Sequence, residues 1–156
     1  HYYDPSAGAR LPGLGVFDLH TAHPGPQAPR CIGNVVVEWG GAPNGAPRTL
    51  VGFENHGGRT FLGSEATPFA RVAAGYGNNG SDRTEGVVVG NTIGTYIHGS
   101  LLPKNPHLAD RLISLALDPS GGTELEPLDD SVEWLAHETV LEHVAPALRG
   151  STGSRR

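Results

Sequence analysis

Short hydrophobic runs dominate the first hundred residues and predict strands rather than helices. The strongest run is Cys31–Trp39, whose consecutive valines suit a strand buried in a sheet. A stretch rich in glycine and proline separates it from Thr49–Asn55, and such a stretch is typical of a hairpin connection. The other predicted strands are Gly15–Thr21, Phe69–Gly77, Val87–Val89 and Thr92–His98, with a turn predicted over 56–60.

Helical spacing begins after Pro103. Asn105 is a good N-cap residue and Pro106 suits the first helical position, and leucines then recur at helical spacing up to Pro119. This pattern predicts a first helix that ends near Pro119.

A second helix is predicted to begin at Asp130, because Glu133 follows three residues later as in a capping box. His137 and His143 fall on different faces of this helix and are interpreted as surface residues. The apolar face is predicted to consist of Val132, Ala136, Val140, Val144 and Leu148.

The order of the elements limits the fold class. Strands followed by two helices, without regular β-α-β alternation, predict a small α+β domain or the strand-rich second half of an α/β domain. The 156 residues suffice for one domain, and 23 glycines and 13 prolines indicate many turns around a modest core. Residues 1–149 are assigned to this domain and 150–156 to a flexible tail.

Charge and composition exclude several classes. The net charge is −5 and no Lys/Arg run precedes the terminal Ser-Arg-Arg, which argues against binding to nucleic acid or to an anionic membrane surface. No apolar run is long enough to span a membrane. The single cysteine rules out an internal disulfide and fits a reducing, cytoplasmic location. The chain begins with histidine and contains no methionine, so we expect it to be processed or cut from a longer chain.

His98 is the first candidate for chemistry. A strand end is a rigid support for a side chain, Gly99 leaves room beside it, and an imidazole can act as general base and then general acid. The alternative is a partly buried histidine that caps a sheet edge.

Cys31 and Arg30 stand together before the valine run. A lone cysteine among several histidines raises the possibility of a Cys–His pair, but Cys31 lacks the small flanking residues of a nucleophile elbow, so a buried hydrophobe is the better interpretation. The Arg30 guanidinium can hold a carboxylate in a bidentate fork, although an ordinary surface arginine is the alternative.

A metal site is the rival chemistry, but its spacings match no known ligand geometry and the chain has no H-E-x-x-H motif. No nucleotide-binding glycine motif is present either, and Asn78 and Asn79 are interpreted as turn residues. The residues considered for the metal are His20, His23, Glu54, His56 and His98.

Four segments appear in an order that resembles a known family: Leu11–Thr21, Gly52–Thr60, Gly75–Asn79 and Glu85–Pro106. Together they resemble the GatD-type glutamine amidotransferase subunits of lipid II isoglutaminyl synthases, within the class I amidotransferases of the cobyric acid synthase kind. The resemblance implies an α/β fold: the strand-rich C-terminal part of a flavodoxin-like class I domain, followed by two helices.

The resemblance also implies a function. Such a subunit hydrolyses glutamine and supplies ammonia to a MurT-like Mur ligase partner, which uses ATP to amidate the D-glutamate of lipid II in peptidoglycan synthesis. This subunit itself is expected to need no cofactor, and the ATP belongs to the partner.

The family's motifs assign two residues. His98 lies at the position of the catalytic histidine in Gly94-Thr95-Tyr96-Ile97-His98-Gly99, and Arg30 matches the arginine that holds substrate glutamine. The family's nucleophilic cysteine belongs to a C-G-G-Y-Q elbow upstream of a segment like Tyr2–Gly15, and this chain lacks that elbow. We therefore expect the chain alone to be inactive. No acid lies two positions beyond His98, and a carboxylate of the partner is one candidate for orienting the imidazole.

Three alternatives stay open. One is a cobyric-acid-synthase-like amidotransferase with another acceptor, which the partner would distinguish. Another is a non-catalytic interaction domain, which the presence or absence of the upstream elbow would decide. A metal-dependent protein is the third, and elemental analysis would test it.

Overall fold

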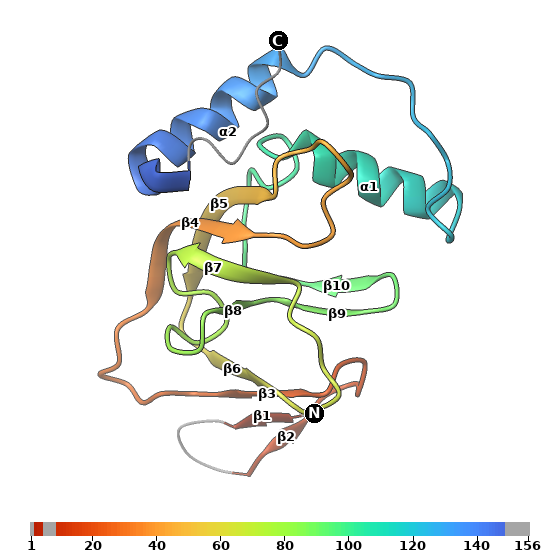
Figure 1. The fold of residues 1–156 in the computed structure, drawn as a ribbon. Coiled ribbons are helices and arrows are strands. Elements are labelled where there is room, and N and C mark those ends of the chain that lie inside the picture. Colours follow the sequence, from red (N-terminus) through yellow and green to blue (C-terminus); the bar gives the residue numbers. More distant parts are fainter. Residues whose placement is uncertain (1, 5–8, 149–156) are drawn as a thin grey trace.

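The computed structural model describes residues 2–4 and 9–148, so the tail assigned to 150–156 lies outside the described residues. The described chain up to Gly94 consists of strands and the loops that connect them, and two helices follow (Figure 1). The helices are α1 (Pro106–Leu117) and α2 (Ser131–Val144), with a short 3₁₀ helix η1 (Pro146–Leu148). The strands are β1 (Tyr2–Asp4), β2 (Leu11–Pro12), β3 (Leu19–Ala22), β4 (Cys31–Glu38), β5 (Thr49–His56), β6 (Arg59–Leu62), β7 (Ala70–Ala74), β8 (Thr84–Glu85), β9 (Val87–Val89) and β10 (Thr92–Gly94).

The strands form two four-stranded sheets and one hairpin. The sheet that carries the candidate site has the order β5-β4-β7-β8, and all its described pairs are antiparallel. The second sheet has the order β2-β1-β3-β6 and contains the parallel pair β1–β3. Strands β9 and β10 pair with each other. The predicted hairpin is confirmed, because β4 and β5 pair from Cys31 opposite His56 to Glu38 opposite Thr49.

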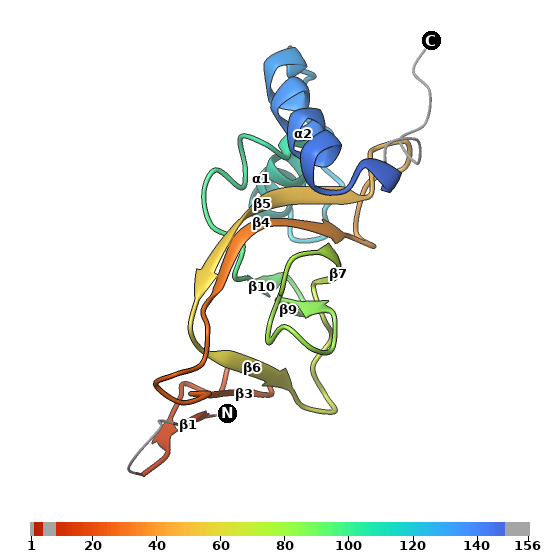
Figure 2. The ribbon, with the colours of Figure 1, turned by 90° about the vertical axis from the view of Figure 1, so that its left-hand side faces the viewer.

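The valine run is buried on both faces of β4. Val35 and Val37 belong to a core with Leu108 of α1, and Val36 belongs to a second core with Leu141 of α2. Both helices lie at one end of the molecule, and β1, β2, β3 and β6 lie at the other (Figures 1 and 2). The continuous hydrophobic run is therefore explained by a strand that lies between two apolar layers.

The apolar face predicted for the second helix is confirmed in part, because Val140, Val144 and Leu148 pack against the second core. His137 and Leu141 are its buried residues, whereas Val132 is 71% exposed. The interpretation of His137 as a surface residue is wrong, because its two ring nitrogens have polar partners in the interior. His143 is exposed, as predicted. Neither Asn105 nor Asp130 makes a side-chain cap bond to its helix.

The turn predicted over 56–60 and the strand predicted over Thr92–His98 need correction. Residues 59–62 form β6, where a turn was predicted. The strand predicted over Thr92–His98 ends at Gly94, because the Glu85 carboxylate takes the Tyr96 N–H and the Thr95 hydroxyl. His98 then rejoins a sheet through a single antiparallel bridge to Phe53. Within the described residues, no helix is both long and apolar enough to cross a bilayer.

Candidate functional site

His98 and Arg30 meet at one residue of β5. The Arg30 Nε donates to Asn55 Oδ1 (2.9 Å), and its Nη2 donates to the Asn55 carbonyl oxygen (3.1 Å). The His98 Nε2 lies 3.4 Å from the same carbonyl oxygen. All three side chains are exposed. The structure thus brings together the two residues that the sequence assigns to catalysis and to substrate binding.

Backbone groups at the free edge of β5 determine where His98 lies. Strand β5 is the outer strand of its sheet, and the His98 N–H donates to the Phe53 carbonyl at 2.7 Å. Residues two apart on a strand direct their backbone groups to the same edge, so the carbonyls of Phe53 and Asn55 face His98 together. The imidazole is therefore held by backbone pairing and not by a continuous strand.

Arg59 holds the loop that enters β4. Its Nη2 donates to the Pro29 carbonyl at 2.6 Å, and its Nη1 donates to the carbonyls of Gly57 and Gly58. A Cβ at Gly57 would lie 3.4 Å from the Arg30 Nη1. The glycine pair and Arg59 together bring the backbone before Arg30 close to the end of β5.

A buried polar layer lies on the opposite face of β5. The Glu54 carboxylate accepts the N–H groups of Tyr76 (2.7 Å) and Gly77 (2.9 Å). A Cβ at Gly75 would come within 2.7 Å of Glu54 Oε1, and Gly75 also has a φ of +111°, so glycine is required there. The backbone of the glycine-rich segment that begins at Gly75 therefore lies directly against the Glu54 carboxylate.

Rings and a second carboxylate complete the buried layer. The His56 and Tyr96 rings stack at 3.9 Å between centroids, and the Tyr96 hydroxyl lies 2.8 Å from Thr60 Oγ1. The fully buried Glu85 accepts the Tyr96 N–H at 3.0 Å, and burial raises the pKa of its carboxyl. These contacts hold the segment that leads into His98.

Cys31 is the buried hydrophobe that its context predicts. It is 1% exposed, and burial raises the pKa of its thiol. Its cross-strand partner is His56, so its side chain lies on the face opposite that of Asn55. Burial and a raised pKa both disfavour a thiolate, which argues against Cys31 as the nucleophile.

The metal candidates do not assemble. Among residues 2–4 and 9–148, no group of three or more His, Cys, Asp or Glu side chains is placed to hold an ion. Glu54 and His56 approach to 3.9 Å, while His20 stacks on Phe61 and His23 is exposed.

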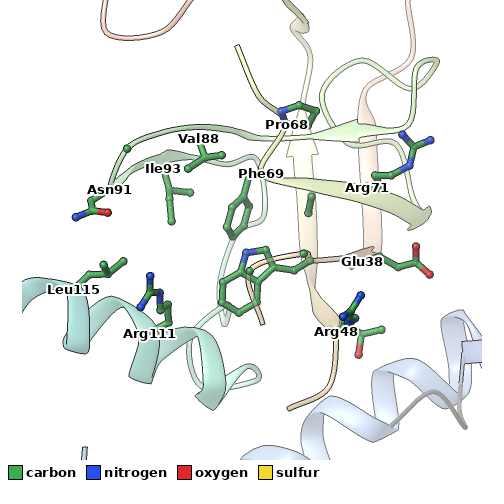
Figure 3. Close-up of a pocket in the computed structure, with 16 residues that line it drawn as sticks. Glu38, Arg48, Pro68, Phe69, Arg71, Val88, Asn91, Ile93, Arg111 and Leu115 are labelled. Carbon is green, nitrogen blue, oxygen red and sulfur yellow. The ribbon is translucent and has the colours of Figure 1, made fainter. Parts of the chain in front are cut away.

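A cavity of about 760 Å³ lies at the other end of the β4–β5 hairpin (Figure 3). Trp39 and Phe69 line it together with Arg48, Arg71 and Arg111. Neither Arg30 nor His98 is among its lining residues, so this cavity is separate from the candidate site.

Sequence comparison now defines the class of protein. Residues 1–106 match the CobB/CobQ-like glutamine amidotransferase domain, and the chain belongs to this family. The match includes Arg30, Asn55 and His98.

The chain is similar to subunit GatD of lipid II isoglutaminyl synthase (glutamine-hydrolyzing) from two bacteria. It is 36% identical over 136 residues to the Staphylococcus aureus (strain N315) protein, covering 86% of this chain and 52% of that one. It is 37% identical over 125 residues to the Streptococcus pneumoniae (strain ATCC BAA-255 / R6) protein, covering 80% and 46%. A probable cobyric acid synthase of Methanothermobacter thermautotrophicus (strain Delta H) is 33% identical over 132 residues, covering 81% and 25%. The chain spans about half the length of the two GatD proteins.

Three residues of the site were not predicted from the sequence: Asn55, Arg59 and Glu85. Asn55 joins the two assigned residues, Arg59 fixes the approach to Arg30, and Glu85 fixes the approach to His98. The available signal was polar residues at successive positions of an otherwise apolar strand, followed directly by Gly57-Gly58-Arg59. That pattern indicates polar side chains on both faces of the strand.

Proposed function

We propose that this protein is the glutamine-hydrolysing subunit of an amidotransferase, and that its residues 1–149 form the C-terminal part of a flavodoxin-like class I domain. The observation that carries the proposal is the convergence of His98 and Arg30 on the Asn55 carbonyl. Membership of the glutamine amidotransferase family supports it.

In this proposal, His98 takes the proton of a cysteine thiol that lies outside these 156 residues, since Cys31 is buried. The thiolate attacks the side-chain amide carbon of glutamine, and His98 returns the proton to the departing nitrogen, which leaves as ammonia. Water then cleaves the thioester with His98 as base and releases glutamate. Arg30 holds the α-carboxylate of glutamine in its guanidinium fork and so orients the amide.

A third group is expected to orient the imidazole. Among the described residues, no carboxylate is hydrogen-bonded to the His98 ring, and the residues after it are Gly99 and Ser100. We assign this role to a carboxylate of the ligase partner.

The similarity to two GatD subunits favours one acceptor. The ammonia would pass to a MurT-like Mur ligase that consumes ATP and amidates the D-glutamate of lipid II in the cytoplasm. The similarity to a probable cobyric acid synthase keeps a different acceptor as the second candidate. Co-purification of the native complex identifies the ligase and so separates the two.

The test is His98→Ala in the full-length subunit bound to its ligase, with glutamate release from glutamine as the readout. We expect a loss of about a thousandfold or more in kcat with an unchanged melting temperature. His143→Ala is the matched control, because His143 is an exposed histidine far along the chain on α2. Normal turnover in His98→Ala would end the assignment.

Arg30 is tested separately by Arg30→Ala. Losing the guanidinium removes a charge-assisted contact to the α-carboxylate, so KM for glutamine should rise about tenfold to a hundredfold. Arg30→Lys should recover only part of the affinity, because an ammonium cannot form the bidentate fork. An unchanged KM in Arg30→Ala would refute the carboxylate role.

A further inference from the structure

Three alternate residues of β5, namely Val51, Phe53 and Asn55, direct their backbone groups to the strand edge on which His98 lies. The Val51 backbone bonds the Asn105 side chain, the Phe53 carbonyl accepts from the His98 N–H, and the Asn55 carbonyl lies beside the His98 ring. Asn105 and His98 are therefore neighbours along the same strand edge, at a spacing set by the strand repeat.

The Asn105 carboxamide makes the two backbone hydrogen bonds at Val51 that a neighbouring strand would otherwise make. Its Oδ1 accepts the Val51 N–H at 2.9 Å, and its Nδ2 donates to the Val51 carbonyl at 2.8 Å. The residue is fully buried, and its Oδ1 also accepts a bond from the His137 Nδ1–H at 3.1 Å. Because a buried amide with satisfied polar atoms is confined to one geometry, Asn105 fixes where the chain stands on the β5 edge.

The connection between His98 and Asn105 (residues 99–104) depends on the same side chain. Asn105 Nδ2 donates to the Leu101 carbonyl at 2.6 Å, and the Asn105 backbone N–H donates to the Leu102 carbonyl at 3.0 Å. The remaining bond runs from His137 Nδ1–H to the Lys104 carbonyl at 2.8 Å. Within the described part of the chain, every hydrogen bond of this connection ends on Asn105 or His137.

The approach to His98 from the other side is held differently. Glu85 binds the Tyr96 N–H and the Thr95 hydroxyl, and the Ile97 side chain is buried in the first core. The segment that precedes His98 is thus fixed by a carboxylate and by packing. In the segment that follows it, Leu101 also packs against the first core, but among the described residues its hydrogen bonds end on Asn105 and His137.

We propose that Asn105 is a positioning residue for His98, which it holds in register on the β5 edge through the connection 99–104. This rests on the proposed role of His98 as the catalytic base. Without the Asn105 carboxamide, the connection loses its bond at Leu101 and its anchor at Val51, so the imidazole can shift along the edge. A displacement of about 1 Å at a catalytic group is enough to cost about a hundredfold in rate.

The experiment compares Asn105→Ala with Leu141→Ala in the full-length subunit bound to its ligase. Leu141 is an equally buried residue of the adjacent helix whose removal destabilises the fold without touching the connection. At a temperature where both variants are folded, we expect Asn105→Ala to lower kcat about tenfold to a hundredfold, with KM for glutamine changed less than about twofold. Leu141→Ala should keep kcat per folded molecule within about twofold.

A spectroscopic readout is independent of turnover. With ¹³C-labelled histidine, the His98 ring signals, assigned by their loss in His98→Ala, should shift or broaden in Asn105→Ala and stay in place in Leu141→Ala. If Asn105→Ala does not fold, Asn105→Asp, which keeps the acceptor for Val51 but loses the donor, is measured the same way. An unchanged kcat with unchanged His98 signals would reduce Asn105 to a purely structural role. Full activity of His98→Ala, by contrast, would overturn the proposed function itself.

A separate observation assigns Arg59 as a positioning residue for Arg30, as Asn105 is for His98. The 2.6 Å bond from Arg59 Nη2 to the Pro29 carbonyl fixes the residue immediately before Arg30 to the loop after β5. Arg59→Lys keeps the charge but cannot span the carbonyls of Pro29, Gly57 and Gly58 at once. We expect KM for glutamine to rise about tenfold with kcat within about twofold, the reverse of the Asn105→Ala split. An unchanged KM would overturn this assignment, and a proportional fall of kcat in both variants would point to general destabilisation and overturn both.

Discussion

The two ends of the β4–β5 hairpin use the same kinds of residue for opposite purposes. At the open end, the side chains of Arg30, Asn55 and His98 are exposed, and Arg30 and His98 both contact the Asn55 carbonyl oxygen. At the end covered by the helices, His137 is buried and bonds Thr49 Oγ1 through Nε2 and the Lys104 carbonyl through Nδ1. Both histidines contact main-chain carbonyls, but only His98 has a ring that solvent and a ligand can reach.

The difference teaches how to separate catalytic from structural histidines. At the covered end both nitrogens of His137 have partners, so no lone pair is left for a substrate proton. At the open end, the hydrogen bond that the His98 ring makes within the described part of the chain is a long one of 3.4 Å. A ring with spare hydrogen-bonding capacity and access to solvent fits acid–base chemistry, whereas a saturated buried ring stabilises the fold.

Removing packing at the covered end should have the largest effect on stability. Leu141 is 1% exposed and lies against Val36 and Val51, so Leu141→Ala should lower the free energy of unfolding by about 3 kcal/mol. Val132→Ala on the same helix should change it by less than about 0.5 kcal/mol, because Val132 is 71% exposed. Urea denaturation of the 156-residue chain measures both, and equal costs would contradict the helix face seen here.

How far the sequence could predict this contrast depends on the residue. The β4–β5 hairpin was predictable, because a valine run and a Gly/Pro-rich loop have few alternatives. The burial of His137 on α2 was not, since its partners come from β5 and from the residues just before α1. The meeting of Arg30 with His98 was also hidden, because it requires the register of a third segment, β5.

The second-largest effect is expected from acid, which should lower the stability of the fold through the buried histidines of the covered end. Burial lowers the pKa of His107 to about 4, and burial also lowers that of His137. A histidine in the unfolded chain binds its proton near pH 6.5, so the unfolded state takes up protons first and stability falls as the pH drops from about 6.5 to 4. The loss due to His107 should reach about 3 kcal/mol.

Chemical denaturation at several pH values tests this assignment. His107→Phe keeps a flat ring among Trp39, Trp134 and His137 but cannot titrate, so its stability should depend less on pH over the same window. A profile as steep as that of the parent protein would exclude His107 as the source.

Cys31 differs from the other residues discussed at the open end, because it is buried whereas Arg30, Asn55 and His98 are exposed. Its raised pKa and 1% exposure predict slow reaction with a thiol reagent at neutral pH, with fast reaction only after unfolding. Cys31→Ala should cost about 1 kcal/mol of stability and leave the proposed glutamine hydrolysis by the full-length protein intact. Loss of hydrolysis in this variant with the fold preserved would make Cys31 the nucleophile after all.

The smallest effect is expected at Ile32, on the uncovered part of β4. Ile32 is 52% exposed, so Ile32→Ala should lower the stability of the 156-residue chain by less than about 0.5 kcal/mol. Ile32 stands opposite Asn55 in the ladder, on the face where the proposed thiol must approach His98. If another part of the full-length protein covers this face, the same substitution will cost more there than in the 156-residue chain, by up to about 1 kcal/mol. An equal loss of stability in both proteins would mean that no other part of the full-length protein covers Ile32. The proposed thiol would then have to reach His98 without packing on Ile32.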